Sequence, residues 1–479
     1  MKTTIRILYL FLIACLLLAC GQRPTAPQPT DTPQATRAPR PTTPPQPTSA
    51  PTEAAVISPE RIASAQEFVD LLAQGDYTTA EEKLTRQMKA ALPASTLEEL
   101  WSSLQKQAGA FQQQTGTHTD RIQGYDVVFV TCQFEQMPLD VKVVFDASGL
   151  IAGLFFVPAQ STTAYEPPAY VKTGSFHEQE VTVGSGEWAL PGTLTLPAGD
   201  GPFPAVVLVH GSGANDRDET LGPNKPFRDL AWGLASQGIA VLRYEKRTKH
   251  YAAKMVALQN TITVKEEVTD DALAAVALLR QEPEIDSQRI FVLGHSLGGM
   301  LLPRIGAADG QIAGLIALAG PTRPLEDTIA EQVTYIVKLD GKISEEEQAA
   351  LDKLAEQVER VKGPQLNAAV SPSDLPLSWP ATYWLDLRGY NPSETAKSLA
   401  QPMLILQGGR DYQVTIYDFD IWKTALSARA NGQLKFYADL NHLFITGQGP
   451  ITPDEYMIPG HVAEQVINDI AAWIKGIIP

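Results

Sequence analysis

A serine in a glycine-rich turn is the residue of this sequence best suited to nucleophilic chemistry. The apolar run Ile290–Leu293 predicts a buried strand, Gly294-His295-Ser296-Leu297-Gly298 follows it, and Met300–Ala308 predicts a helix. G-x-S-x-G between a strand and a helix is the pattern of a nucleophile elbow, in which a tight turn requires small flanking residues. The helix N-terminus behind Ser296 would offer unpaired N–H groups to a developing oxyanion. An incidental serine in a glycine-rich turn is the alternative, but the whole pattern favours a serine hydrolase.

A nucleophilic serine needs a base that takes its proton. In this arrangement the order along the chain is serine, then a carboxylate, then histidine. Only His442 and His461 follow Ser296 in the sequence. His442 lies in a loop directly after the last predicted strand, where it can turn toward the serine, whereas His461 opens the final predicted helix as a surface residue. The sequence therefore favours His442 as the base.

The base needs a carboxylate that orients it. The predicted strand Met403–Gln407 runs into Gly408-Gly409-Arg410-Asp411, so Asp411 stands at the carboxyl end of its strand, where ligand chemistry gathers in α/β sheets. The alternative is a turn or N-cap aspartate, because a helix is predicted from about Thr415. Three other aspartates are weaker candidates, two because they lie in that helix and one because it is too close to His442: Asp418, Asp420 and Asp439.

The oxyanion of the reaction needs backbone donors. One is expected from the amide of Leu297, and the second from the loop after the strand within Ala205–Gly213. Gly211 would let that loop approach the substrate closely, which makes the amide of Ser212 the expected second donor. His210 precedes the nucleophile at a strand end, so we expect it to support the loop rather than act as a base.

The elements that must position these residues alternate between strand and helix. Short apolar strands separated by helical patterns predict a mostly parallel sheet covered on both faces. We expect eight strands, at Val181–Val183, Gly192–Leu196, Ala205–Val209, Ala240–Arg243, Ile290–Leu293, Ile312–Ala319, Met403–Gln407 and Leu434–Tyr437. Helices are expected at about 226–237, 263–280, 297–308, 415–428 and 460–475.

A long insertion interrupts this alternation at about 321–400. Ser344 and Glu347 form a capping-box pattern there, before the apolar spacing of a helix. An insertion of this length between two strands predicts a helical cap over the active site. Four aromatic residues of the insertion could line an apolar acyl pocket or could form only the core of the cap: Trp379, Tyr383, Trp384 and Tyr390.

Residues 57–160 predict a separate small α+β domain, ahead of a larger domain at 161–479. Apolar stripes predict helices, the last starting at Ser95 with Glu98 completing a capping box. His118 is expected in a polar loop without a partner, and no residue of this domain suggests catalysis, so its role stays unknown. Strands are expected around Val127–Phe134, Val141–Phe145 and Leu150–Val157, with Ala147-Ser148-Gly149 as the last turn.

The first residues of the chain are typical of an export signal. Residues 1–19 carry Lys2 and Arg6 before a short apolar run, and Leu17-Leu18-Ala19-Cys20 resembles the bacterial lipoprotein box. This resemblance implies cleavage before Cys20 and lipidation of it; an ordinary signal peptide is the alternative. Residues 20–56 are rich in Pro and Thr and predict a disordered tether. The protein is therefore expected on the outer face of a bacterial membrane, anchored by lipid.

Composition limits the partners and cofactors. The net charge is −16, with no basic stripe, so no nucleic-acid partner is indicated. Three cysteines, of which Cys132 alone lies in a predicted domain, cannot build a disulfide framework or a metal cluster. The seven histidines show no spacing such as H-E-x-x-H. We therefore expect no metal and no organic cofactor, and no protein partner is evident.

Several runs of the sequence together resemble bacterial α/β-hydrolase carboxylesterases of the EstD type. The likeness spans about 160–479, and the small front domain fits the family arrangement. It implies the α/β-hydrolase fold and hydrolysis of short-to-medium acyl esters through an acyl-enzyme, with Ser296, Asp411 and His442 matching the triad. The family often has Tyr-Asp-Lys-Arg where this chain has Glu245, which leaves open whether this charged group is more than a structural ion-pair cluster. The runs are His210–Thr220, Gly222–Ala231, Arg243–Arg247, Gly294–Gly299, Gln407–Val414 and Asn441-His442.

The acceptor of the acyl group is not fixed by these residues, since fold and triad set acyl transfer alone. A peptidase or an acyltransferase on the same fold is one alternative. A surface-binding lipoprotein with a vestigial hydrolase domain is another, although the intact serine, aspartate, histidine and glycine set argues against it.

Overall fold

The computed structural model describes residues 57–122, 125–159, 165–258 and 261–477. The predicted leader, Cys20 and the Pro/Thr-rich tether lie outside these residues. Within the described part of the chain, no helix has both the length and the apolar character needed to span a membrane.

The small domain consists of helices packed on an antiparallel sheet with strand order β1-β2-β3-β4. Its core contains Phe68, Trp101 and Cys132, all buried. The helices are α2 (Pro59–Gln74), α3 (Tyr77–Glu82), α4 (Arg86–Ala91) and α5 (Ala94–Ala108), and the strands are β1 (Phe111–Ile122), β2 (Tyr125–Phe134), β3 (Pro138–Phe145) and β4 (Ile151–Pro158).

Two sequence predictions for this domain are wrong. His118 does not lie in a loop without a partner: it belongs to β1, stacks on Phe129 with ring centroids 4.4 Å apart, and has Nε2 3.8 Å from Oδ2 of Asp140. The expected capping box at Ser95 is also absent, because α5 begins one residue earlier, after Pro93, without a side-chain cap. Both errors arise where polar residues occupy regular elements.

The larger domain is built on an eight-stranded sheet, and each of its predicted strands is present. The strand order is β12-β11-β10-β9-β7-β8-β6-β5, in which only β5–β6 and β6–β8 pair antiparallel. This mostly parallel sheet with helices on both faces confirms the predicted α/β-hydrolase fold. The strands are β5 (Phe176–Val183), β6 (Leu190–Pro197), β7 (Phe203–Val209), β8 (Ala240–Tyr244), β9 (Ile285–His295), β10 (Gly314–Leu318), β11 (Met403–Gly408) and β12 (Gly432–Tyr437).

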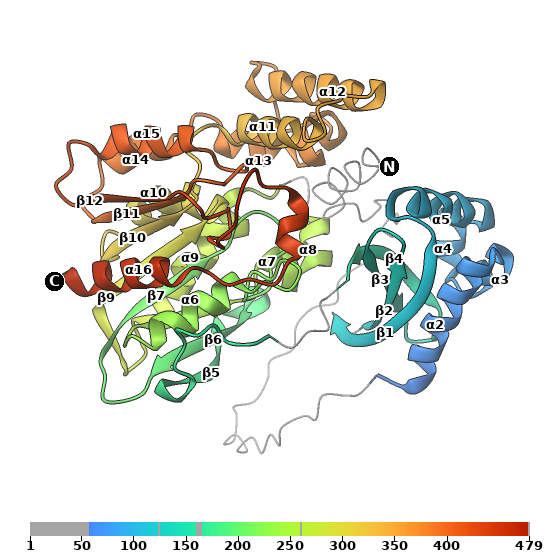
Figure 1. The fold of residues 1–479 in the computed structure, drawn as a ribbon, viewed down its shortest axis with the longest axis horizontal. Coiled ribbons are helices and arrows are strands. Elements are labelled where there is room, and N and C mark those ends of the chain that lie inside the picture. The colour runs from blue at the N-terminus through green and yellow to red at the C-terminus, as the bar shows by residue number, and fades with distance from the viewer. Residues whose placement is uncertain (1–56, 123–124, 160–164, 259–260, 478–479) are drawn as a thin grey trace, which may run out of the picture.

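Two apolar clusters cover the two faces of this sheet. Side chains alternate between faces along a strand, so Val207 joins one cluster while its neighbours Val206 and Leu208 join the other. α6 (Pro226–Ala235) and α16 (Glu464–Gly476) pack side by side on one face (Figure 1). α9 (Asp270–Leu279), α10 (Leu297–Ala308) and α15 (Ile416–Leu426) cover the other face. The short helices α7 (Arg247–His250) and α8 (Ala252–Ala257) were not predicted.

The insertion between β10 and β11 forms the predicted helical segment, seen above the sheet in Figure 1. The capping box of Ser344 and Glu347 is present at the start of its longest helix. Tyr335 stacks on Tyr412 with ring centroids 4.7 Å apart, which places this segment against the loop after β11. Its helices are α11 (Leu325–Val337), α12 (Glu345–Lys362), α13 (Ala381–Leu387) and α14 (Pro392–Lys397).

Candidate active site

Ser296 occupies a strained turn between β9 and α10. Its backbone has φ 51° and ψ −116°, a conformation that non-glycine residues rarely adopt, and its amide donates to the carbonyl of Leu318 at 2.9 Å. A Cβ on Gly294 would lie 2.3 Å from the carbonyl oxygen of Gly298, and a Cβ on Gly298 would lie 2.3 Å from that of Val209. Glycine is required here because backbones approach closely. The predicted elbow geometry is therefore present.

Asp411 and His442 are brought together as predicted. Nδ1 of His442 lies 2.7 Å from Oδ2 of Asp411, and both side chains are buried. The other carboxylate oxygen, Oδ1, accepts from the amides of Gln413 at 2.8 Å and Val414 at 3.0 Å. One oxygen thus stabilises a turn and the other faces the imidazole, and the role of Asp411 as the orienting carboxylate stays a prediction.

The loops after β11 and β12 pack tightly enough to fix this pair. A Cβ on Gly408 would lie 2.5 Å from the carbonyl oxygen of Leu440, which also accepts from the amide of Arg410 at 2.9 Å. Asn441, next to His442, is buried, and its Oδ1 accepts from the amides of Leu443 at 3.0 Å and Ile445 at 3.1 Å. These hydrogen bonds hold the backbone next to His442 in a turn, so the imidazole of His442 has a defined position.

His295, the neighbour of Ser296 in the sequence, connects the elbow to the loop of His442. The His295 and His442 rings have centroids 4.6 Å apart, and Nε2 of His295 lies 3.0 Å from the backbone oxygen of His442. Within the described residues no hydrogen bond joins the Ser296 hydroxyl to His442. Catalytic hydrogen bonds are often long before substrate binds. The proton path between Ser296 and His442 stays a prediction.

The loop of residues 210–225, which we call the β7–α6 loop, lies against the elbow. A Cβ on Gly211 would come 3.1 Å from Cβ of Ser296, so a side chain there would crowd the serine. Ser212 is exposed, and no acceptor among the described residues takes a hydrogen bond from its amide or from that of Leu297. Both predicted donors are thus available.

Three buried charged residues around this loop were missed by the sequence analysis: Glu219, Lys246 and His295. Oε1 of Glu219 accepts from the amide of Gly211 at 2.6 Å, and Nζ of Lys246 donates to its carbonyl at 2.7 Å. Glu219 also pairs with His295 at 2.9 Å. These residues lie in the stretches that carried the family resemblance, but nothing in their spacing identified the contacts.

The charged group after β8 forms ion pairs. Glu245 accepts from Arg217 at 2.9 Å, and Lys246 pairs with Glu267 at 2.6 Å. Arg247 pairs with Asp271, whose pKa burial raises to about 6. A structural ion-pair cluster is therefore present, and through Lys246 it reaches Gly211.

The two histidines rejected as bases have other partners. Nε2 of His210 lies 3.0 Å from the backbone oxygen of Asp216, within its own loop, and burial lowers its pKa to about 4, so it supports the loop as predicted. Nδ1 of His461 lies 3.1 Å from Oδ1 of Asp229, and His461 precedes α16 instead of opening it. Asp418 is occupied by Arg323 and Thr322.

The aromatic residues of the insertion are largely internal. Trp379, Tyr383 and Trp384 are buried and pack on one another, with the Trp379 and Trp384 rings stacked at 5.7 Å. The Tyr390 hydroxyl donates to the backbone oxygen of Met300, on α10 behind the elbow, at 2.8 Å. They form part of the domain core, and their contact with substrate stays a prediction.

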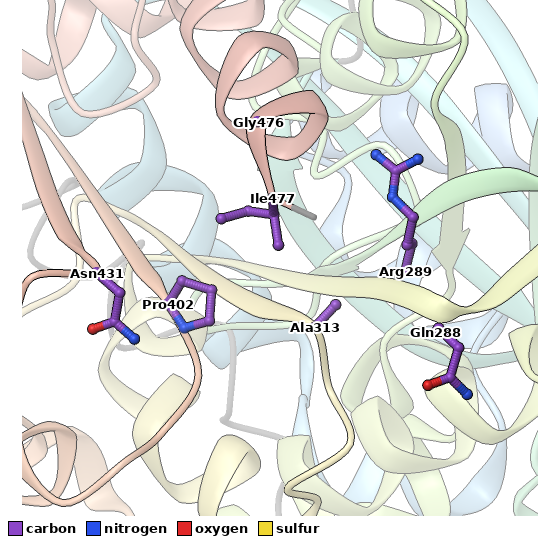
Figure 2. A pocket seen from close by; sticks show the side chains of 7 residues that line it. All are labelled: Gln288, Arg289, Ala313, Pro402, Asn431, Gly476 and Ile477. Carbon is purple, nitrogen blue, oxygen red and sulfur yellow. The ribbon is translucent and has the colours of Figure 1, made fainter. Parts of the chain in front are cut away.

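A surface hollow lies elsewhere, at the other end of the sheet (Figure 2). Ala313 and Pro402 line it, and each directly precedes a parallel strand whose opposite end faces the Ser296 side. This hollow is therefore unrelated to Ser296. No group of three or more His, Cys, Asp or Glu side chains in the described parts of the chain could hold a metal ion.

Two family models and several known proteins match this chain. The family described as "Alpha/beta hydrolase family" matches residues 206–449, and one described as "Protein of unknown function (DUF3887)" matches residues 65–154. Esterase EstD of Thermotoga maritima is 42% identical over 407 residues, covering 85% of this chain and 93% of the relative. Esterase FrsA of Klebsiella pneumoniae is 28% identical over 163 residues, 34% of this chain and 36% of the relative. A solved structure of the Pyrococcus furiosus esterase PF2001 is 16% identical with a TM-score of 0.40, covering 67% and 97% of the two chains.

Proposed function

Because the chain belongs to the α/β-hydrolase family and is a hydrolase, we propose that it is a serine carboxylesterase that cleaves short-to-medium acyl esters. The relative named Esterase EstD supports ester hydrolysis. The single observation that carries the residue assignment is the buried 2.7 Å contact between His442 and Asp411, beside a strained serine at the end of β9. That arrangement supports acyl transfer through a covalent intermediate.

In the proposed mechanism His442 acts as the general base. Asp411 faces Nδ1, which keeps the proton on that nitrogen and leaves Nε2 free to take the proton of the Ser296 hydroxyl. Ser296 then attacks the ester carbonyl, and the imidazolium that forms is stabilised by the Asp411 carboxylate. The same proton passes to the leaving alcohol, and water activated by His442 releases the acyl group.

The oxyanion of the tetrahedral intermediate would be bound by the amides of Ser212 and Leu297. Leu297 is the first residue of α10, so its amide belongs to the unpaired N–H groups of a helix N-terminus. Loss of one such donor lowers turnover by about 100- to 1000-fold in serine hydrolases. The close approach of Gly211 to Ser296 supports Ser212 as the second donor.

Hydrolysis of a graded panel of nitrophenyl esters and of aminoacyl amides tests this function. We expect the purified protein to hydrolyse esters of short-to-medium chains much faster than the amides, and Ser296→Ala and His442→Ala each to lower kcat by several powers of ten. Preferential cleavage of amides would instead indicate a peptidase. Faster acyl transfer to added alcohols or amines than to water would indicate an acyltransferase.

We also propose that the insertion contributes to the acyl pocket through Trp379, Tyr383, Trp384 and Tyr390. Tyr390 supports this assignment because it contacts α10 directly behind the elbow. Trp379→Leu should then shift the preferred acyl length of the substrate. An unchanged chain-length profile with a lowered melting temperature would show that the aromatic group serves only as core.

For localisation we propose a lipid anchor at Cys20 on the outer face of a bacterial membrane. The support is the sequence alone: the apolar leader, the Leu17–Cys20 pattern and the Pro/Thr-rich tether. Radiolabelled palmitate should enter the wild-type protein, which should fractionate with membranes. In Cys20→Ala the label should be lost, and persistent labelling of that variant would contradict the proposal.

A further inference from the structure

We infer that Glu219 and His295 form a positioning pair that fixes the β7–α6 loop relative to the loop of His442. This inference rests on the proposed function and extends it to two residues that touch neither substrate nor reacting atoms. The residue before the nucleophile is itself a buried histidine, paired with a carboxylate that lies far away in the sequence.

The pair is deeply buried and has no substitute partner. Nδ1 of His295 lies 2.9 Å from Oε2 of Glu219, with side chains only 7% and 8% exposed. Within the described residues neither atom makes a hydrogen bond, with the other or with a third group, so the contact is a buried ion pair. Burial alone would lower the pKa of His295, but the Glu219 carboxylate outweighs it and the pKa is raised; burial would raise the pKa of Glu219, but His295 and its other partners lower it. Removal of either residue therefore leaves a buried polar group unpaired.

The other atom of each side chain reaches a different loop. Oε1 of Glu219 accepts from the Gly211 amide at 2.6 Å, and Nε2 of His295 lies 3.0 Å from the backbone oxygen of His442. A carbonyl oxygen can only accept, so Nε2 of His295 carries a proton and donates it. The pair thus connects the backbone beside Ser212 to the backbone of His442, across the residue that precedes Ser296.

These connections affect two positions that the proposed mechanism needs fixed, that of the oxyanion donor and that of the base. Gly211 precedes the proposed oxyanion donor Ser212, and the backbone of His442 carries the proposed base. A displacement of about 1 Å within an active site can lower the rate about 100-fold. The pair of Glu219 and His295 therefore positions backbone groups, whereas the pair of Asp411 and His442 takes part in the proposed proton transfer.

Conservative substitutions can remove separately the contact of His295 with His442 and its contact with Glu219. The amide nitrogen of Asn can occupy the place of Nδ1, so His295→Asn keeps Glu219 paired and loses the contact with His442. Gln reaches the place of Nε2, so His295→Gln keeps the contact with His442 and leaves Oε2 of Glu219 without its partner. Glu219→Gln can accept from Gly211 and donate to Nδ1 of a neutral His295, whereas Glu219→Ala loses both contacts.

The test measures ester hydrolysis by these variants of the full chain, with kcat expressed per Ser296 titrated by a fluorophosphonate. We expect His295→Asn, His295→Gln and Glu219→Ala to lower kcat about 10- to 100-fold with KM within about threefold, and Glu219→Gln to recover most of the rate. The double variant His295→Gln/Glu219→Ala should be no slower than the worse single variant, since both act through one pair. His461→Gln is the matched control: it alters a carboxylate–imidazole pair of the same domain outside the site, and its kcat should be unchanged.

Unchanged kcat per titrated site in His295→Asn, His295→Gln and Glu219→Ala, with only the melting temperature lowered, would overturn the inference and leave a structural ion pair. Multiplicative losses in the double variant would also overturn it, because the two residues would then act separately. A wild-type protein that neither reacts with the fluorophosphonate nor hydrolyses esters would instead remove the proposed function itself.

Discussion

Asp411 divides its two carboxylate oxygens between structure and proposed chemistry. Oδ1 accepts from the amides of Gln413 and Val414, and Oδ2 faces Nδ1 of His442. A turn aspartate and a triad aspartate were alternatives at the level of sequence, yet one residue can serve both roles because its two oxygens point to different groups. Because the two oxygens have different partners, a substitution can change the contact with His442 and keep the contacts with the turn amides.

Asp411→Asn should abolish most activity while retaining the fold. The Asn oxygen can still accept from the turn amides, but its NH₂ group would face Nδ1 of His442. Nδ1 must then accept, the proton moves to Nε2, and the imidazole cannot take the Ser296 proton. By analogy with other serine hydrolases, kcat should fall by about 10⁴-fold. Steady-state kinetics and a thermal melt check this, and kcat within tenfold of wild type would contradict the assignment of Asp411.

The elbow is the element on which the site depends most directly. Gly298 lies where α10 starts, under the last residues of β7, so a methyl group there would meet the backbone oxygen of Val209. This contact between two backbones is what brings the β7–α6 loop, with Gly211 and Ser212, up against Ser296. Packing of this kind cannot relax by a rotamer change.

Gly298→Ala should therefore destabilise the protein, whereas Gly310→Ala should not. A Cβ at Gly298 would come 2.3 Å from the Val209 oxygen, while a Cβ at Gly310, just after the same helix, would meet no atom within 4 Å. Overpacking of a core costs about 1–3 kcal/mol, and a clash with fixed backbone should reach the upper end of that range. Urea unfolding measures both variants; equal midpoints would show that the elbow tolerates the extra methyl group.

The elements that the sequence did not predict lack the apolar pattern on which such a prediction depends. β1 carries Gln, Thr, His and Asp along most of its length and becomes a strand only by pairing with the apolar β2. α7 and α8 are single turns or little more, too short for an apolar period. The central strands β7, β8 and β10 were predictable because each is a short apolar run buried on both faces, whereas the edge strands β5 and β12 are partly exposed.

Across the whole molecule, the candidate site too could be predicted only in part from the sequence. Ser296, Asp411 and His442 could be proposed because each follows a predicted strand end in an expected order. The Glu219–His295 pair and the contact from Lys246 to Gly211 could not, since they join loops that are distant in sequence and depend on the three-dimensional packing of those loops. A sequence pattern identifies reacting groups more readily than the groups that hold them.

One further contact links distant parts of the larger domain and depends on pH. Asp229 on α6 accepts from Tyr165, near the start of the domain, and pairs with His461, near its end. Its hydrogen bond with His461 raises the pKa of that histidine above the ordinary value of 6.5. A raised pKa in the folded state gives stability that is fully present below the unfolded pKa and lost as pH rises through the folded one.

His461→Phe should accordingly destabilise the protein more at pH 5.5 than at pH 9. The difference in unfolding free energy from wild type should shrink as pH rises through the raised pKa of His461. Urea unfolding of both proteins at several pH values measures it. A difference that stayed constant or grew with pH would show that the pair contributes no charge-dependent stability.

The central claim is that Ser296 carries the acyl group, and its most direct measurement is the mass of the trapped acyl-enzyme. Brief reaction with a nitrophenyl ester, acid quench and peptide mapping should find one acyl group on the peptide containing Ser296. The adduct should be absent from Ser296→Ala and should form far more slowly in His442→Ala. An acyl group on another residue, or undiminished ester turnover by Ser296→Ala, would contradict the account.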